Sequence, residues 1–195
     1  MFSYKIVTVF AMLMMVFTSA FAGDKYVPDP AHTNIGFQVK HMVITTVSGN
    51  FTDYDYSFVY DEKNPENSAI KASIKVASVN TDNEKRDNHL RSGDFFDAEK
   101  HPEITFESNK IIQNDDGFVA VGNLTMRGVT KEIELPFTIT GIIQDPWGNT
   151  KMGVESRLTI DRQDFNVSWN NTLDTGGLVV SDEVDIILDL QLKKS

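Results

Sequence analysis

The stretch "DEVDIILDLQLK", residues 182–193, shows the pattern on which the fold depends. Every second residue is a large aliphatic one, and most of the residues between them are acidic or amide side chains. Successive side chains of a β-strand point to opposite faces, so this period of two predicts a strand with one dry and one wet face. Ile187 is the one apolar residue out of register. The apolar positions are Val184, Ile186, Leu188, Leu190 and Leu192.

The same period of two recurs along the chain, for example in "NIGFQVK" (34–40), "AIKASIKV" (69–76) and "KEIELPFTITG" (131–141). Clusters of Asp, Asn, Gly and Pro separate these runs, as in "QNDDGF" (113–118) and "DPWGN" (145–149), and such residues favour tight turns. Long antiparallel strands with one apolar face are best satisfied when the sheet closes on itself, because closure removes the exposed edges. The sequence therefore predicts an all-β fold, an extended antiparallel barrel of about eight strands.

One segment, residues 81–102, interrupts the strand pattern. Thr81 and Glu84 have the spacing of a capping box, which predicts the start of a helix, and Gly93 predicts its end. Asp87 and Arg91 are four residues apart, a spacing that favours an ion pair within the helix. The segment is expected to form a short helical insert between two strands.

The N-terminal segment predicts a secretory signal peptide over residues 1–22, followed by one domain over residues 23–195. Lys5 precedes an apolar run that is too short to span a bilayer, and Ala20 and Ala22 have the small side chains expected before a cleavage site. The formal net charge is −10 and becomes −11 when Lys5 is removed. No basic patch is present, which argues against nucleic acid and anionic membrane surfaces as partners. Cysteine is absent, which excludes disulfides and thiol chemistry.

Motifs for catalysis or metal binding are also missing from the sequence. It contains no G-x-S-x-G, H-E-x-x-H or P-loop motif. The four histidines do not have the close spacing typical of zinc ligands, and a site built from His41, His89 and a carboxylate is the alternative. His89 is a candidate for ligand contact or for a structural hydrogen bond. We therefore predict no catalytic residues, no bound metal and no cofactor.

Aromatic residues fall on the apolar sides of several predicted strands. A packed core explains them, and so does a lumen that holds a long apolar molecule, because ligand pockets are lined mainly by aliphatic and aromatic groups. The sequence leaves both interpretations open.

Five motifs along the chain resemble the YceI family of exported bacterial proteins. They include "DPAHTNIGFQVKHM", "RDNHLRSGDFFDAEKHPEITFES" and "GNLTMRGVTKEIELP", with "RQDFN" and "SDEVDIILDLQL" following in order. The resemblance implies a lipocalin-like barrel with a long internal cavity, a periplasmic location and binding of polyisoprenoids or isoprenoid quinones without an established reaction. Many relatives have Gly where this chain has Asn166, and Asn also tolerates the left-handed conformation. The family's central motif positions are Arg86, His89, Leu90, Arg91, Ser92, Phe95 and Phe96.

These observations lead to the hypothesis of a periplasmic carrier that holds one long-chain isoprenoid or fatty lipid in the barrel, without stable membrane insertion. A homodimer is a further expectation. The alternatives are an envelope stress-response or structural interaction protein with a packed barrel, and a weak enzyme acting on the lipid. The predicted ligand-binding residues are Phe37, Val39, Phe51, Ile74, His89, Phe106, Leu135, Phe137 and Trp169.

Overall fold

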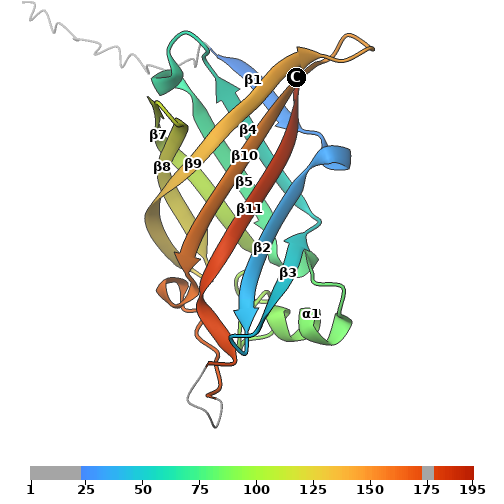
Figure 1. The fold of residues 1–195 in the computed structure, drawn as a ribbon, viewed down its shortest axis with the longest axis vertical. Helices are drawn as coiled ribbons and strands as arrows, with labels where there is room; N and C mark the ends of the chain where they lie inside the picture. Colours follow the sequence, from blue (N-terminus) through green and yellow to red (C-terminus); the bar gives the residue numbers. More distant parts are fainter. Residues whose placement is uncertain (1–22, 173–177) are drawn as a thin grey trace, which may run out of the picture.

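The computed structural model describes residues 23–172 and 178–195, so the expected signal peptide lies outside the described residues. One antiparallel sheet contains all the strands of this part of the chain (Figure 1). The strands are β1 (Asp24–Pro28), β2 (Asn34–His41), β3 (Thr45–Phe51), β4 (Tyr54–Tyr60), β5 (Ala69–Lys75), β6 (Val79–Asn80), β7 (Glu103–Asn114), β8 (Gly117–Met126), β9 (Val129–Gln144), β10 (Thr150–Asp161) and β11 (Val180–Lys194). The helices are α1 (Glu84–Arg91) and the 3-10 turns η1 (Pro30–His32), η2 (Pro65–Asn67), η3 (Val76–Ser78) and η4 (Arg162–Phe165).

These eleven strands form an eight-stranded barrel. Three of the eight positions around the ring, here called staves, are each made of two shorter strands with a break between them. β1 and β2 pair with the same edge of β11, β1 near Leu192 and β2 near Leu188, so together they form one stave. β3 and β4 form the next stave, and β5 and β6 the one after it. The pairing of β1 with β11 closes the ring. The predicted eight-stranded antiparallel barrel with a short helical insert is confirmed.

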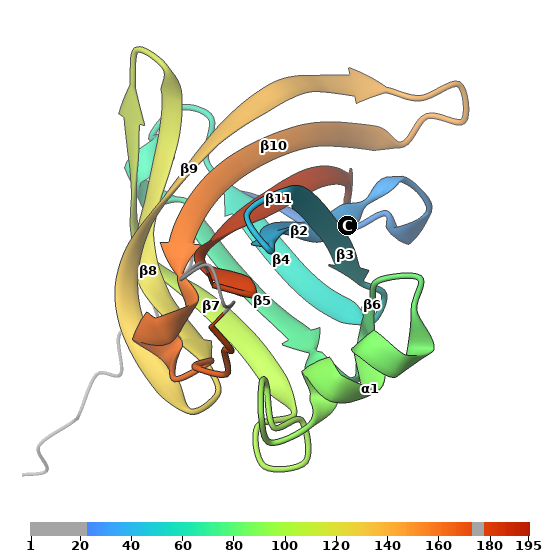
Figure 2. The same cartoon turned by 60° about the horizontal axis from the view of Figure 1, so that its bottom comes forward.

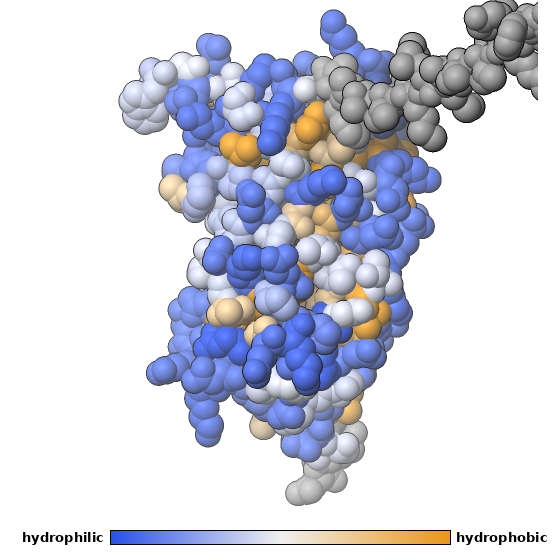
Figure 3. All heavy atoms as spheres, turned by 180° about the vertical axis from the view of Figure 1, so that it is seen from behind, coloured by the Kyte–Doolittle hydropathy of each residue, from blue (hydrophilic) through white to orange (hydrophobic). Residues whose placement is uncertain are grey.

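Alternation along β11 follows the pattern from which the fold was predicted. Val184, Ile186, Leu188, Leu190 and Leu192 all line the interior. Between them, Asp185 accepts a hydrogen bond from the Thr159 hydroxyl and Asp189 forms an ion pair with Arg157, both at the outer surface. The outer surface is largely hydrophilic in the view from behind (Figure 3). The apolar interior therefore forms because every stave turns its dry face inward.

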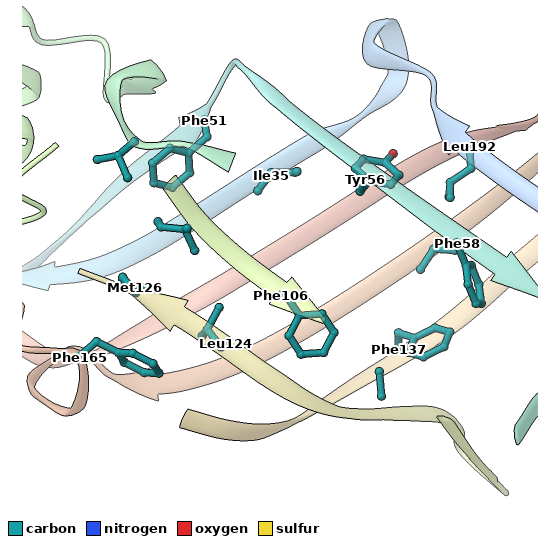
Figure 4. Close-up of a cluster of buried hydrophobic side chains, with 14 of the residues drawn as sticks. Ile35, Phe51, Tyr56, Phe58, Phe106, Leu124, Met126, Phe137, Phe165 and Leu192 are labelled. Carbon is teal, nitrogen blue, oxygen red and sulfur yellow. The ribbon is translucent and has the colours of Figure 1, made fainter. Parts of the chain in front are cut away.

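The two ends of the barrel differ in how they are filled. In Figure 1 the β9–β10 hairpin projects at one end, here called the upper end, and α1 lies at the other, the lower end. At the upper end Phe137 stacks on Phe118, with ring centroids 5.2 Å apart, and meets Phe58 edge-on at 5.8 Å. Met152 and Leu192 are fully buried beside them. Figure 4 shows Phe58 close to Phe137, with Leu192 farther along the wall. Because β4 and β9 lie on opposite sides of the ring, the contact of Phe58 with Phe137 closes the upper end of the barrel.

The ends of the helical insert differ from the sequence-based prediction. Asn83 caps α1 by accepting a hydrogen bond from the Arg86 amide at 3.0 Å, so the helix does not begin at Thr81 as predicted. Its last turn ends at Ser92, which has an extended backbone, and Gly93 does not adopt the left-handed conformation expected of a helix stop. The capping-box prediction was wrong because Thr81 is engaged elsewhere.

Thr81 is buried and binds the side chains of α1. Its amide and hydroxyl both donate to Asp87 Oδ1, at 2.9 and 2.5 Å. Arg91 donates to the carbonyls of Ala77 and Val79, and to the Asn88 side chain. The predicted Asp87–Arg91 ion pair is therefore absent: each side chain instead ties the helix to the preceding segment, where it satisfies backbone groups.

A polar cluster at the break between β1 and β2 joins that stave to its neighbours. The Asp29 carboxylate accepts hydrogen bonds from Lys151 Nζ at 2.6 Å and from Gln191 Nε2 at 2.9 Å, and His32 Nδ1 lies 3.4 Å away. The bond from Lys151, helped by those from Gln191 and His32, lowers the pKa of Asp29 from its ordinary 3.8 to about 2. The charged carboxylate is therefore favoured in the folded state.

This lowered pKa gives an expected dependence of stability on pH. Because the folded-state pKa is below the unfolded one, Asp29 stabilises the fold above about pH 4, and this contribution is lost as the pH falls toward 2. Allowing for solvent screening, we expect Asp29→Asn to cost about 1 kcal/mol at pH 5 and almost nothing at pH 2. Urea unfolding of both proteins at several pH values measures this. A difference that stays constant from pH 5 to pH 2 would contradict the assignment.

Candidate functional site: the barrel lumen

A cavity of about 370 Å³ occupies the interior of the barrel. Its walls are formed by side chains from β2 to β5, from β7 to β11 and from the helical insert, and nearly all of them are aliphatic or aromatic. The volume lies within the range of roughly 300–1,000 Å³ that is usual for small-molecule pockets. The aromatic side chains of the strands therefore surround an open space rather than fill it.

All nine residues predicted from the sequence as ligand-binding line this cavity. They come from five strands, from α1 and from the loop after β10, so the barrel brings together residues that are far apart in the sequence. The nine are Phe37, Val39, Phe51, Ile74, His89, Phe106, Leu135, Phe137 and Trp169.

The cavity is closed at the upper end and more accessible at the lower end. Phe58 and Phe137 at the upper end are buried. Val39 and Trp169, toward the lower end, are only partly buried. Figure 2 shows α1 and the turn after β10 beside this lower end of the barrel. These two segments and the β2–β3 turn surround the lower end of the cavity.

Most of the polar groups on the cavity wall gather at the lower end. They are carried by the end of β2, by the insert and by the start of the loop after β10, whereas the strand walls above them offer only Tyr56 and Ser156. Both of those hydroxyls are hydrogen-bonded within the protein, Tyr56 to Thr33 and Ser156 to the Pro136 carbonyl. The polar residues at the lower end are His41, Thr81, Arg86, His89 and Arg162.

Arg86 is held in place by the insert itself. Its Nε donates to the Thr81 hydroxyl and its Nη2 to the Thr81 carbonyl, both at 2.7 Å. Asp87 binds the same threonine from the other side. These bonds hold one edge of the guanidinium, so that Arg86 forms a fixed cationic part of the cavity wall.

His89 contacts both apolar and polar neighbours. Its ring meets Phe95 and Trp169 edge-on, with centroids 5.0 Å apart in each pair, and Phe95 and Trp169 lie 5.2 Å from each other. Its Nε2 lies 3.0 Å from Asp94 Oδ2. The three rings form a cluster at the lower end of the lumen, and Asp94 orients the imidazole within it.

Phe37 reaches the lumen because its neighbour on β3 is a glycine. Phe37 pairs with Gly49, and a Cβ on Gly49 would lie 2.5 Å from the Phe37 ring and 2.7 Å from Thr81 Cγ2. Such contacts are shorter than van der Waals packing allows. Gly49 therefore makes room for both the aromatic wall and the insert.

Arg162 is a structural residue of the site that was not predicted from the sequence. The residue is only 4% exposed, and its guanidinium donates to the carbonyls of Val167, Trp169 and Ser181 and to Asp182. Burial lowers the pKa of Arg162, and the nearby charge of Asp182 opposes this. Arg162 ties the loop that carries Trp169 to the start of β11. Val154, Ser156 and Ile160 on β10 face the cavity at even-numbered positions, and Arg162 continues this series. That alternation is the sequence signal from which Arg162 could have been predicted to point inward.

Comparison with protein families identifies the chain. Residues 26–192 match the model of the YceI-like domain, which is nearly the whole of the barrel. The chain belongs to the YceI-like family.

Relatives of this YceI-like protein include a UPF0312 protein of Yersinia pestis (strain Pestoides F), 39% identical over 180 residues that cover 92% of this chain and 91% of the relative. The crystal structure of a Campylobacter jejuni YceI protein is 35% identical, covers 86% of this chain and 96% of its own, and superposes with a TM-score of 0.69. A polyisoprenoid binding domain from Saccharophagus degradans shares the fold at 14% identity, with a TM-score of 0.62 over 89% of this chain and 99% of its own.

The turn after η4 forms in this YceI-like protein with Asn166 at the position where many relatives have glycine. Asn166 has φ 59° and ψ 14°, the left-handed conformation predicted for it. Its amide donates to the Gln163 carbonyl, and the Val167 amide donates to that of Arg162. Asn adopts this conformation at little cost, so the loop leaves η4 with Phe165 fully buried.

In residues 23–172 and 178–195, the YceI-like chain has no group of three or more His, Cys, Asp or Glu placed to hold a metal ion. His41 and His89 both line the cavity, but no carboxylate completes a site with them in this part of the chain. No helix there is both long and apolar enough to cross a membrane.

Proposed function

We propose that this YceI-like protein binds and carries a long-chain apolar lipid, a polyisoprenoid or an isoprenoid quinone, in the barrel lumen. The observation that carries the proposal is the cavity of about 370 Å³, which is apolar along its walls, closed above and accessible below. The Saccharophagus neighbour, described as a polyisoprenoid binding domain, supports the choice of ligand class.

Burial of the lipid chain supplies the affinity. Each CH₂ group removed from water contributes about 0.8 kcal/mol, so ten buried groups contribute about 8 kcal/mol. That free energy corresponds to a dissociation constant of roughly 1 μM before the cost of ordering the chain is subtracted. An apolar tail along Phe106, Leu135 and Phe137 therefore suffices for binding, with no polar anchor in the upper lumen.

The polar head of the lipid lies at the lower end in this proposal. Arg86 and His89 offer a guanidinium and an imidazole there, on the wall of the cavity. A phosphate or quinone oxygen accepts hydrogen bonds from such donors. The tail in the lumen and the head at the mouth match the distribution of polar groups along the cavity.

The proposed role is that of a periplasmic carrier without an enzymatic reaction. The expected signal peptide at residues 1–22 supports the location, and the family's binding-domain character supports a role in binding. The alternative, a structural protein with a solid barrel, requires an interior without space, and the cavity argues against it.

The test is native mass spectrometry of freshly purified mature protein, with lipid analysis of an organic-solvent extract. We expect a mass above that of the polypeptide, and recovery of one isoprenoid or other long-chain lipid per chain. Reproducible absence of any lipid, together with failure to take up added isoprenoid quinone from detergent, would disprove the proposal.

A further inference from the structure

The turn between β2 and β3 exposes three consecutive large apolar residues. Met42 is 40% exposed, Val43 72% and Ile44 86%, and Leu178 nearby is 38% exposed. We call these four residues the mouth patch. Single apolar residues at a surface are common, but four that gather in one place indicate a binding surface.

The backbone of this turn is strained. The Ile44 amide donates to the His41 carbonyl, and the two residues between them have positive φ angles, 51° at Met42 and 66° at Val43. This is the conformation of a type I′ turn, which Asn-Gly adopts readily and which a β-branched residue such as Val adopts at a cost. The chain thus keeps an apolar turn where a polar one would be more stable, and such strain is typical of functional positions.

The mouth patch adjoins the accessible end of the lumen. The Met42 amide donates to the Val179 carbonyl at 2.8 Å, which joins the turn to the segment before β11. Val179 and His41, the immediate neighbours of the patch in the chain, both line the cavity. Through Val179, the apolar surface of the turn therefore continues to the inside of the barrel.

The charge of the β2–β3 hairpin differs from that of the rest of the chain. The sequence has 28 acidic residues and a net charge of −10, yet no Asp or Glu lies between Asn34 and Thr52. Lys40 is its one charged residue at neutral pH, and its amino group donates to the Thr46 hydroxyl. The hairpin therefore has no carboxylate that would have to lose water of hydration at an apolar surface.

We propose that the mouth patch docks on the surface of a lipid bilayer, with Met42, Val43 and Ile44 inserted at the level of the headgroups. This rests on the proposed function, because a long-chain apolar lipid resides in membranes and has to reach the lumen from one. Docking places the mouth of the barrel against the acyl chains, so the lipid transfers without crossing water. The partner is a zwitterionic bilayer, since the net charge of the protein opposes an anionic one.

The other exposed apolar turn does not serve this purpose. Trp147 and Ile143, at the tip of the β9–β10 hairpin, lie at the closed upper end, and Asp145 sits between them. Neither residue lines the cavity. They provide a matched control for the mouth patch, because they are equally exposed but distant from the mouth.

The experiment compares the mature protein with the double variant Met42→Asn, Val43→Gly. Asn-Gly relieves the strain in the turn, so the variant is expected to unfold at the same temperature as the wild type or above it. Sedimentation with phosphatidylcholine vesicles is expected to show binding at least about tenfold weaker, and transfer of isoprenoid quinone from the vesicles should slow by a similar factor. Uptake of the same quinone from detergent should remain unchanged.

The control variant Ile143→Asn, Trp147→Gln should bind vesicles as the wild type does. Wild-type vesicle binding that survives Met42→Asn, Val43→Gly, or that is lost in the control variant instead, overturns the docking assignment. So does a wild type that binds no vesicles. Failure of the proposed function has a different signature: no quinone enters the wild type from detergent, whatever happens with vesicles.

Discussion

Replacing Arg162 by methionine is expected to lower the free energy of unfolding by about 3 kcal/mol or more, the largest loss we predict for a single substitution. The change leaves the buried carbonyl of Val167 and the partly buried carbonyl of Trp169 without their donor, and Asp182 without its ion-pair partner. Unpaired buried polar groups cost about 1–3 kcal/mol each. Thermal unfolding should occur roughly 6–12 °C lower, at about 2–4 °C for each kcal/mol.

The matched control is Arg157→Met. Arg157 lies on β10, the strand that ends directly before Arg162. Arg157 is exposed and pairs with Asp189 at the surface, and such pairs contribute only about 0–1 kcal/mol. Thermal unfolding monitored by circular dichroism compares the two variants. If Arg162→Met is no less stable than Arg157→Met, the loop that carries Trp169 does not depend on the buried guanidinium.

Filling the lumen should have the largest effect on binding. Ile133 lines the cavity from β9, and Ile133→Trp places an indole in the space that the lipid chain would occupy. Because that space is hollow, the barrel can accommodate the larger side chain with a modest loss of stability. We expect the affinity for isoprenoid quinone to fall at least about tenfold, which is ~1.4 kcal/mol. Titration in detergent, followed by fluorescence of the tryptophans, measures it.

The same substitution at Ile143 is the control for this experiment. Ile143 lies on the same strand but is exposed at the tip of the hairpin, outside the cavity. Ile143→Trp should leave the affinity unchanged. Equal affinities of the Ile133→Trp variant and the wild type would show that the lipid binds elsewhere, and the lumen would then have no part in the function.

Local rules were sufficient for the strands and not for the insert. Alternation in β11 and turn residues such as those of 145–149 depend only on neighbours along the chain, and the structure has them where the pattern predicts. The helix start at Thr81 was wrong because the Asp87 side chain, from the first turn of the same helix, accepts hydrogen bonds from the Thr81 hydroxyl and amide. Asn83 then caps the helix in its place. Capping rules assume that the side chain of the cap residue is free to accept from the first backbone amides of its helix, and the Thr81 side chain is bound to side chains of α1 instead.

For the candidate site, the sequence indicated which side chains face inward. Phe37, Leu135 and Phe137 were chosen for their position in alternating runs, and each lines the cavity. Arg162 was missed because a single arginine at the end of a strand looks like a surface residue. Only the packed loop gives its guanidinium the carbonyls that make burial favourable.

The sequence by itself determined the all-β class, the inward and outward faces of the strands and the closure of the barrel, because side-chain direction in a strand is set by local backbone geometry. The tertiary structure alone decided that the barrel encloses a cavity of about 370 Å³ and that aromatic side chains meet across its upper end. The space in a lumen depends on the combined volumes of side chains from all eight staves, and these side chains are distant in the sequence. The pattern of residues within a single strand therefore cannot predict whether the lumen is filled or open.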